Sequence, residues 1–137
     1  MDEENPSDVE VGGWLKTLGI ESLCQWDVLV FFHGHQMSLL RPAYLASLLG
    51  YEIGAVAAVL DVLEALRLVE PSRVSQGVRL YRFTVQADPQ RRDASERLFA
   101  LGNSRSGRVG LLKKLRAGNA TPREGLQAAQ RLLEETK

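Results

Sequence analysis

The sequence predicts a mainly α-helical protein with one small β-hairpin, and three signals in the middle of the chain carry that prediction. A short apolar segment runs from Pro42 to a terminating glycine, Gly50. A longer segment with helical periodicity follows over residues 52–68. After a turn at 75–77, an alternating run, VRLYRFTV, begins at Val78. This order predicts two angled helices followed by a hairpin.

The two central segments have the local chemistry of helices. Pro42 suits the first turn, where its missing N–H has no partner, and Gly50 suits the left-handed position just past a helix end. In the first segment the residues at helical spacing are Leu45, Leu48 and Leu49. In the second, the expected buried stripe contains Val56, Val59, Leu60, Leu63 and Leu66. Only Tyr51 and its neighbours separate the segments, which fits a tight turn.

The alternating run predicts a half-buried strand. Its two faces would hold, respectively, Tyr81, Phe83, Val85 and Leu80, Arg82, Thr84. The strand is expected to pair back toward residues 67–70, with a break in the preceding chain at Pro71-Ser72. The hairpin tip, residues 73–77, would then project from the domain.

Helices are also expected on both sides of this central unit. An apolar helix is predicted over residues 20–32, ending near Gly34, with Trp26 in the core. Residues 1–19 are too short for a domain and are predicted to form an N-terminal arm. In that arm Trp14 would cap the core or pack on a second subunit. The central domain is therefore assigned to residues 20–87.

Residues 88–137 are predicted to form a C-terminal helical extension. Its first helix would start at the cap Asp88-Pro89, end at Gly102, and bury Ala94, Leu98 and Leu101. The second would open at Ser106-Gly107, stop at Gly118, and bury Val109, Leu112 and Leu115. The third would start with a capping box at 121–124 and display Leu126, Ala129, Leu132 and Leu133. This extension would either form a homodimer or pack within a monomer.

The central pattern resembles a known family. LASLLG, then V-x-x-V-L-x-x-L-x-x-L-x-LVE, then G-V-R-L-Y-R-F, is similar to the winged helix-turn-helix of small bacterial transcriptional regulators of the MarR, ArsR and PadR type. The resemblance covers residues 21–85 and consists of core and turn positions. It implies a winged helix-turn-helix plus C-terminal helices, with double-stranded DNA as partner. Its second helix would be the recognition helix and residues 73–77 the wing.

The resemblance implies a set of DNA-contacting residues. They are Arg41, Tyr51, Glu52, Ala55, Ala58, Arg73, Ser75, Gln76, Arg79 and Arg82. The arginines would bind the phosphate groups of the DNA backbone. The recognition helix, however, offers no arginine, lysine, asparagine or glutamine for bidentate base contacts, and Glu52 and Asp61 would repel phosphate. Alanine can still contact a thymine methyl group, and Glu52 could accept from a cytosine amine. The alternative is that this small apolar face meets another protein.

A net charge of zero conceals a sharp asymmetry. Residues 1–70 carry 3 basic and 11 acidic side chains, whereas residues 71–137 carry 14 basic and 6 acidic ones. The basic side chains after the hairpin tip include Arg79, Arg82, Arg91, Arg92, Arg97, Arg105, Arg108, Lys113, Lys114 and Arg116. They predict a basic face that attracts phosphate backbones. There are two alternatives. These side chains would form solvated helix faces that balance the charge of the acidic half, or they would bind an acidic partner protein.

Composition and motifs set the remaining bounds. The 137 residues, 45% hydrophobic and 25% charged, suit one globular domain with an appendage. The longest early apolar run, residues 28–32, is too short for a membrane span, and the acidic start is unlike a signal peptide, so a cytoplasmic protein without membrane contact is expected. Cys24 is predicted to be a buried thiol.

Catalytic and cofactor motifs are weak in this chain. His33 and His35 lack a third ligand nearby, so no metal and no cofactor are predicted. GNSRSGRV, residues 102–109, lacks the lysine and Ser/Thr of a phosphate-binding loop. Neither histidine lies in a recognisable nucleophile–base context, which predicts a non-enzyme. A ligand-gated or metal-gated sensor, or a small enzyme, remains the third alternative beside the DNA-binding regulator and the protein-interaction module.

Overall fold

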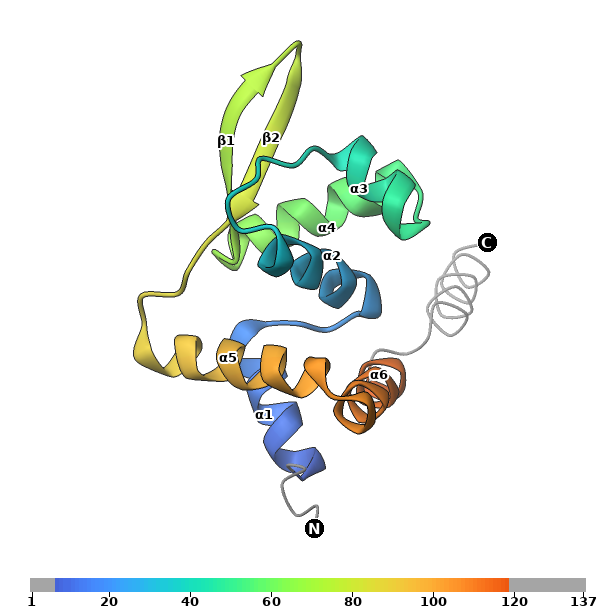
Figure 1. Cartoon of the computed structure of the whole chain (residues 1–137), viewed down its shortest axis with the longest axis vertical. Coiled ribbons are helices and arrows are strands. Elements are labelled where there is room, and N and C mark those ends of the chain that lie inside the picture. Colours follow the sequence, from blue (N-terminus) through green and yellow to red (C-terminus); the bar gives the residue numbers. More distant parts are fainter. Residues whose placement is uncertain (1–6, 119–137) are drawn as a thin grey trace, which may run out of the picture.

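The structure, a computed structural model, describes residues 7–118, which form six helices and one hairpin. In chain order the elements are α1 (Asp8–Leu18), α2 (Leu23–Gly34), α3 (Pro42–Leu49), α4 (Ile53–Ala65), β1 (Val69–Ser75), β2 (Val78–Phe83), α5 (Pro89–Asn103) and α6 (Arg105–Gly118). The hairpin projects from the end of the molecule that holds α3 and α4, while α1, α5 and α6 gather at the other end (Figure 1). The predicted fold class, mainly α with a small hairpin, is confirmed, and the layout is compatible with a winged helix. The helix predicted from residue 121 lies outside the described residues.

Short-range chemistry explains where most helices begin and end. Ser7 and Ser22 are the N-caps of α1 and α2, each within a complete capping box. Pro42 occupies the first turn of α3, and Gly50 follows its last residue with a left-handed φ of 80°, both as predicted. The side chain of Asp88 accepts a backbone hydrogen bond at the start of α5, which confirms the predicted cap.

The end of α4 differs from the prediction. The helix stops at Ala65 instead of residue 68. Arg67 adopts a left-handed φ of 63°, which turns the chain out of the helix and into β1. The N–H of Leu68 still bonds the carbonyl of Leu63, so the carbonyls of the last turn stay satisfied. An arginine gives no sequence signal for a left-handed position, and periodicity alone therefore overestimated the helix.

The two strands pair antiparallel, with Glu70 opposite Arg82. The turn between them is Gln76-Gly77, as predicted. Both turn residues have positive φ, 54° and 79° respectively. Positive φ at both positions is the geometry of a type I′ turn, whose twist matches that of the flanking strands. The hairpin is therefore closed by a tight two-residue turn.

Two predictions about the strands are wrong. Pro71 does not break the first strand, because it pairs with Tyr81 inside β1. The N–H and carbonyl of Tyr81 bond Leu40 on its other side, so this pair requires no N–H from Pro71. The register shifts between Pro71 and Val74. The second strand ends at Phe83, and Val85 lies beyond it, exposed to solvent instead of sharing the buried face of Tyr81.

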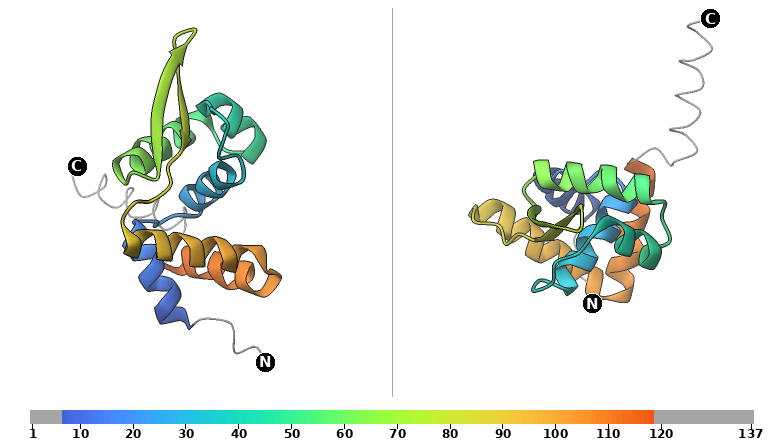
Figure 2. Two further views of the ribbon diagram at one scale, coloured as in Figure 1. Left: turned by 60° about the vertical axis from the view of Figure 1, so that its left-hand side comes forward. Right: turned by 90° about the horizontal axis from the view of Figure 1, so that it is seen from above.

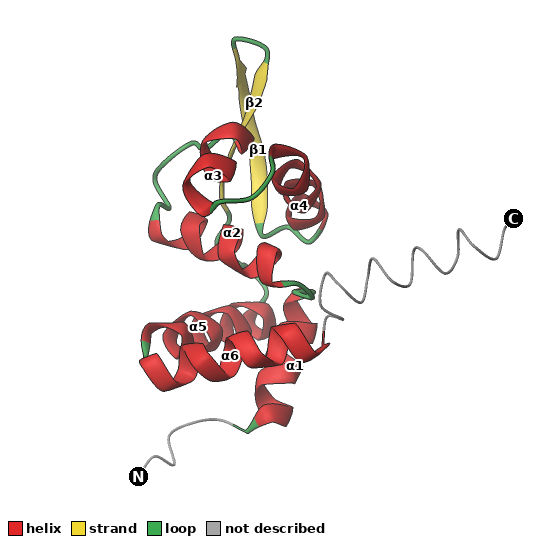
Figure 3. Cartoon of the chain, turned by 90° about the vertical axis from the view of Figure 1, so that its right-hand side faces the viewer, coloured by secondary structure: helices red, strands yellow, loops and turns green. Residues whose placement is uncertain are grey.

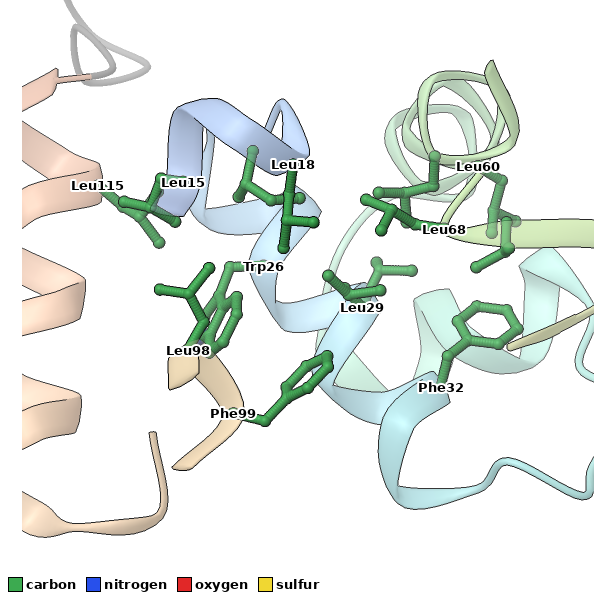
Figure 4. Packing of buried hydrophobic residues seen from close by; sticks show 14 of the residues in the cluster. Leu15, Leu18, Trp26, Leu29, Phe32, Leu60, Leu68, Leu98, Phe99 and Leu115 are labelled. Atoms are coloured by element: carbon green, nitrogen blue, oxygen red, sulfur yellow. The ribbon is translucent and has the colours of Figure 1, made fainter. Parts of the chain in front are cut away.

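One hydrophobic core joins the two ends of the molecule, and α2 lies between them (Figure 4). Trp26 of α2 stacks on Phe99 of α5, with ring centroids 5.7 Å apart. Leu29 and Phe32, on the same helix, are fully buried. Helix α1 packs against α5 and α6, and Trp14 lies against the core, one of its two predicted places.

Two apolar residues placed on a helical stripe by their spacing face solvent instead. Leu48 is 52% exposed, because the buried side chains of α3 are Leu45 and Ala46 and Leu48 points away from them. Val109 is 48% exposed, because α6 buries Leu111 and Leu115, four residues apart, and Val109 lies on the opposite side. In each case the true buried face is rotated from the predicted one.

Candidate nucleic-acid interface

Helices α3 and α4 have the relative orientation of a helix-turn-helix. They are bent by 117° across the short break at Gly50, Tyr51 and Glu52. Both lie at the foot of the hairpin (Figure 3). A bend of this size lies within the range for two helices joined by a tight turn. No single helix in the described chain is long and apolar enough to cross a membrane, and α3 and α4 approach that length only as this bent pair.

Core packing fixes which face of α4 points outward. Val56, Leu60 and Leu63 are fully buried against the rest of the domain, so the opposite face meets solvent. The exposed residues of this face, together with its flanks, are Ile53, Gly54, Ala55, Ala57, Ala58, Asp61, Val62 and Ala65. The predicted contact residues Ala55 and Ala58 are therefore at the surface. The same face carries no cation.

Tyr51, predicted to contact DNA, is engaged inside the protein. Its hydroxyl donates a hydrogen bond to Oδ2 of Asp27 on α2, at 2.6 Å. Burial raises the pKa of Tyr51, and the bond to Asp27 raises the pKa further, so the phenol stays neutral. This bond ties the α3–α4 turn to α2 and positions the start of α4. Glu52, the next residue, is the exposed N-cap of α4 and makes no side-chain cap bond.

The hairpin carries three arginines at its surface, hereafter the hairpin arginines: Arg73, Arg79 and Arg82. Nη1 of Arg79 lies 3.8 Å from Oε1 of Glu64, and Nε of Arg82 bonds Oε2 of Glu70. The side chains of Arg79 and Arg82 remain 53% and 56% exposed. Ion pairs this open to water are weak, so a phosphate can compete for both arginines. Among the described residues Arg73 has no ion-pair partner.

The other predicted hairpin residues and Arg41 lie at the same end of the molecule. Ser75 and Gln76 are exposed at the tip of the hairpin. Leu40 exchanges two backbone hydrogen bonds with Tyr81 of β2, at 2.7 and 2.8 Å. Arg41 follows Leu40 directly. It is therefore an exposed residue between the edge of the hairpin and the start of α3. The structure thus gathers the predicted residues on the hairpin, the turn and α4.

One arginine of the predicted basic face, Arg91 of α5, is used within the fold. Nη1 of Arg91 donates to the carbonyl of Thr17 at 3.1 Å, Nη2 to the carbonyl of Leu66 and Nε to Oε1 of Gln86. Gln86 is buried and in turn donates to the carbonyl of Arg67. One guanidinium thus joins the ends of α1 and α4 to the start of α5.

The next two arginines are also engaged locally. Arg92 donates to the backbone carbonyls of Gln86 and Ala87. Arg97 pairs with Asp93 one turn earlier and lies over the ring of Trp14, 5.6 Å from its centroid. Both side chains stay exposed, and what separates them from the hairpin arginines and Arg41 is their place on α5, at the other end of the molecule (Figure 1).

The histidines and the cysteine have structural surroundings. His33 stacks on Phe99 with centroids 3.8 Å apart, and burial lowers its pKa. His35 stacks on Phe31. Burial, followed by the nearby carboxylate of Asp27, raises the pKa of the half-buried Cys24 thiol. Within residues 7–118 no three His, Cys, Asp or Glu side chains are grouped to hold a metal ion.

No family model, curated protein or solved structure matches this chain. The likeness to winged helix-turn-helix regulators therefore rests on the residues and geometry described above.

Sequence patterns missed two long-range polar contacts, one at the start of α4 and one that uses an arginine within the fold. Tyr51 and Asp27 are 24 residues apart, and Arg91 and Thr17 are 74 apart. Neither pair belongs to a local motif, so no spacing rule could reveal it. A tyrosine in a tight turn beside a core helix was the one available hint that its hydroxyl would find an internal partner.

Proposed function

We propose that this chain is a transcriptional regulator that binds double-stranded DNA through a winged helix-turn-helix. One observation carries the proposal: helix α4 and the arginine-bearing hairpin lie at the same end of the molecule (Figure 2), and one face of α4 is exposed there. A helix of this width fits the major groove of B-DNA, and a projecting hairpin beside it reaches the neighbouring backbone.

The charges on α4 and on the hairpin give the two elements different proposed roles. Helix α4 contains Asp61 and Glu64 and no cation, so it contributes no attraction to phosphate. Attraction would come from the hairpin arginines and from Arg41, all of which are exposed. The small side chains of Ala55 and Ala58 would let α4 approach the base edges closely. Affinity is therefore expected to be modest and strongly dependent on salt.

The proposal includes a homodimer formed at the opposite end of the molecule. Helices α1, α5 and α6 gather there, away from the hairpin (Figure 1). Val109 is an exposed apolar side chain on the outer side of α6, suited to a second subunit. A two-fold dimer would match a palindromic DNA site.

A second candidate function is a winged-helix module that binds another protein. It is favoured by the exposed face of α4, on which Ile53 and Val62 are apolar and solvent-exposed. A face of this kind fits a protein surface without any phosphate contact. Reversing the charge of the hairpin arginines separates the two functions, because it would abolish DNA binding and leave a contact through Ala55 and Ala58 largely intact.

The test is binding to random duplex DNA at low and at moderate salt. The variant changes Arg73, Arg79 and Arg82 to glutamate, and the matched control makes the same three charge reversals elsewhere, at Lys16, Arg105 and Lys113. We expect wild-type affinity to fall steeply with salt, the hairpin variant to lose binding, and the control to retain most of it. Absence of wild-type binding even at low salt would contradict the proposal.

A further inference from the structure

We propose that α4 discriminates between DNA sequences by apolar contact with the C5-methyl groups of thymine, and not by donating hydrogen bonds to base edges. The inference rests on the proposed function, because it names what the DNA-facing surface of α4 would read. Its basis is the combination of an outward face without hydrogen-bond donors and a neighbouring hairpin with exposed arginines.

The first two turns of α4 cannot form hydrogen bonds through side chains. Residues 53–60 are all aliphatic or glycine. The polar side chains of this helix, Asp61 and Glu64, come later and only accept hydrogen bonds when ionised. Guanine and adenine N7, guanine O6 and thymine O4 all require a donor. Side chains of α4 therefore have no way to recognise these atoms.

The same turns do present methyl and methylene groups to solvent. Ile53 is 55% exposed at the first position of the helix. Ala55 and Ala58 are exposed and three residues apart, so their Cβ atoms are neighbours on one face. Among the groups that the base edges present in the major groove, the methyl group of thymine is the apolar one. Apolar contact with that methyl group is the interaction these side chains offer.

The rest of the domain holds this face in place. Val56, Leu60 and Leu63 are fully buried and fix the rotation of α4 about its own axis. The hydrogen bond between Tyr51 and Asp27 fixes where the helix begins. A methyl contact is short-ranged, so it discriminates only if the helix is presented rigidly. Charge complementarity between the hairpin arginines and the phosphates would bring the duplex to this face.

The experiment starts with DNA sites selected by the full chain from a random duplex pool. In the best site each thymine is then replaced by uracil, which lacks only the methyl group. We expect at least one position at which affinity falls about fourfold, the loss that corresponds to one methyl group removed from an apolar contact. Replacement in a random duplex should leave affinity unchanged.

A protein variant assigns the contact to α4. Ala58→Ser keeps the side chain small but makes it polar, and it should reduce the thymine-to-uracil effect at one position. Ala100→Ser, the same change at an exposed position of α5, is the matched control and should preserve the effect.

Two outcomes would overturn the inference in distinguishable ways. If every uracil replacement is without effect while salt-dependent DNA binding persists, the methyl contact is wrong and the proposed function stands. If the chain binds no DNA at all, both fail, and the exposed face of α4 belongs to a protein partner.

Discussion

The hairpin and the start of α5 both carry arginines, but the protein uses them in opposite ways. Arg79 and Arg82 keep more than half of their side-chain surface in water and have only weak, open ion pairs. Arg91 is partly buried and bonds two backbone carbonyls and a buried glutamine. The difference shows that a count of basic residues does not measure a binding surface.

The placement of Arg91 has a simple physical reason. Thr17 lies in the last turn of α1, and Leu66 is the C-cap of α4, so their carbonyls lack helical partners. The C-terminal end of a helix also carries partial negative charge. One guanidinium satisfies both ends at once. The arginines of the hairpin have acidic side chains as their ion-pair partners instead, Glu64 for Arg79 and Glu70 for Arg82.

The largest expected effect is on Arg91. Arg91→Ala leaves the carbonyls of Thr17 and Leu66 without their partner, and we expect it to lower the free energy of unfolding by about 3 kcal/mol. Arg73→Ala, at an exposed site, should change it by less than about 0.5 kcal/mol. Urea denaturation measures both. Equal effects would remove the distinction between the two groups of arginines.

Tyr51 was predicted to contact DNA, but like Arg91 it is bonded inside the protein. Tyr51→Phe removes the hydrogen bond to Asp27 and should destabilise the protein by about 1 kcal/mol. Because the pKa of Tyr51 is raised in the folded state, that part of the stability is complete below about pH 10 and is lost as pH rises further. Unfolding measured from pH 8 to 11 should therefore depend less on pH in Tyr51→Phe. Identical profiles would mean that the hydroxyl has no internal role.

A substitution in the hairpin turn should destabilise the hairpin without affecting α5. Gly77 has a φ of 79°, and a Cβ at this position would meet open space, so the cost of Gly77→Ala comes from backbone conformation alone. We expect a loss of about 1 kcal/mol. Hydrogen exchange should be faster in β1 and β2 and unchanged in α5. Faster exchange throughout the chain would show that the hairpin is part of the main cooperative unit.

The smallest expected effect concerns the acidic partner of a hairpin arginine. Glu64→Gln removes a carboxylate that competes with phosphate for Arg79, and DNA affinity should rise about threefold, within the energy of one exposed ion pair. Glu96→Gln, an exposed site on α5, is the control and should have no effect. A fall in affinity for Glu64→Gln would indicate that the ion pair positions Arg79 for binding.

Local signals in the sequence were sufficient for much of the fold. Gly50, Asp88 and the Gln76-Gly77 turn each act through neighbouring residues, and the structure has them where they were predicted. The left-handed Arg67 was not predicted, because an arginine gives no sequence signal for that conformation. The internal bond of Tyr51 was not predicted, because its partner Asp27 is 24 residues away in the chain. Helical periodicity predicted which side chains of α4 are exposed. It did not predict that Arg91 is bonded within the fold while the hairpin arginines are exposed.

The salt dependence of DNA binding, measured one arginine at a time, tests the central claim most directly. If the hairpin arginines contact phosphate, Arg73→Ala and Arg79→Ala should each lower the slope of log affinity against log salt by about 0.9. Arg97→Ala, which removes an equally exposed arginine from α5, at the other end of the molecule from the hairpin, should leave that slope unchanged. Equal reductions for all three variants, or none for the hairpin variants, would contradict the account.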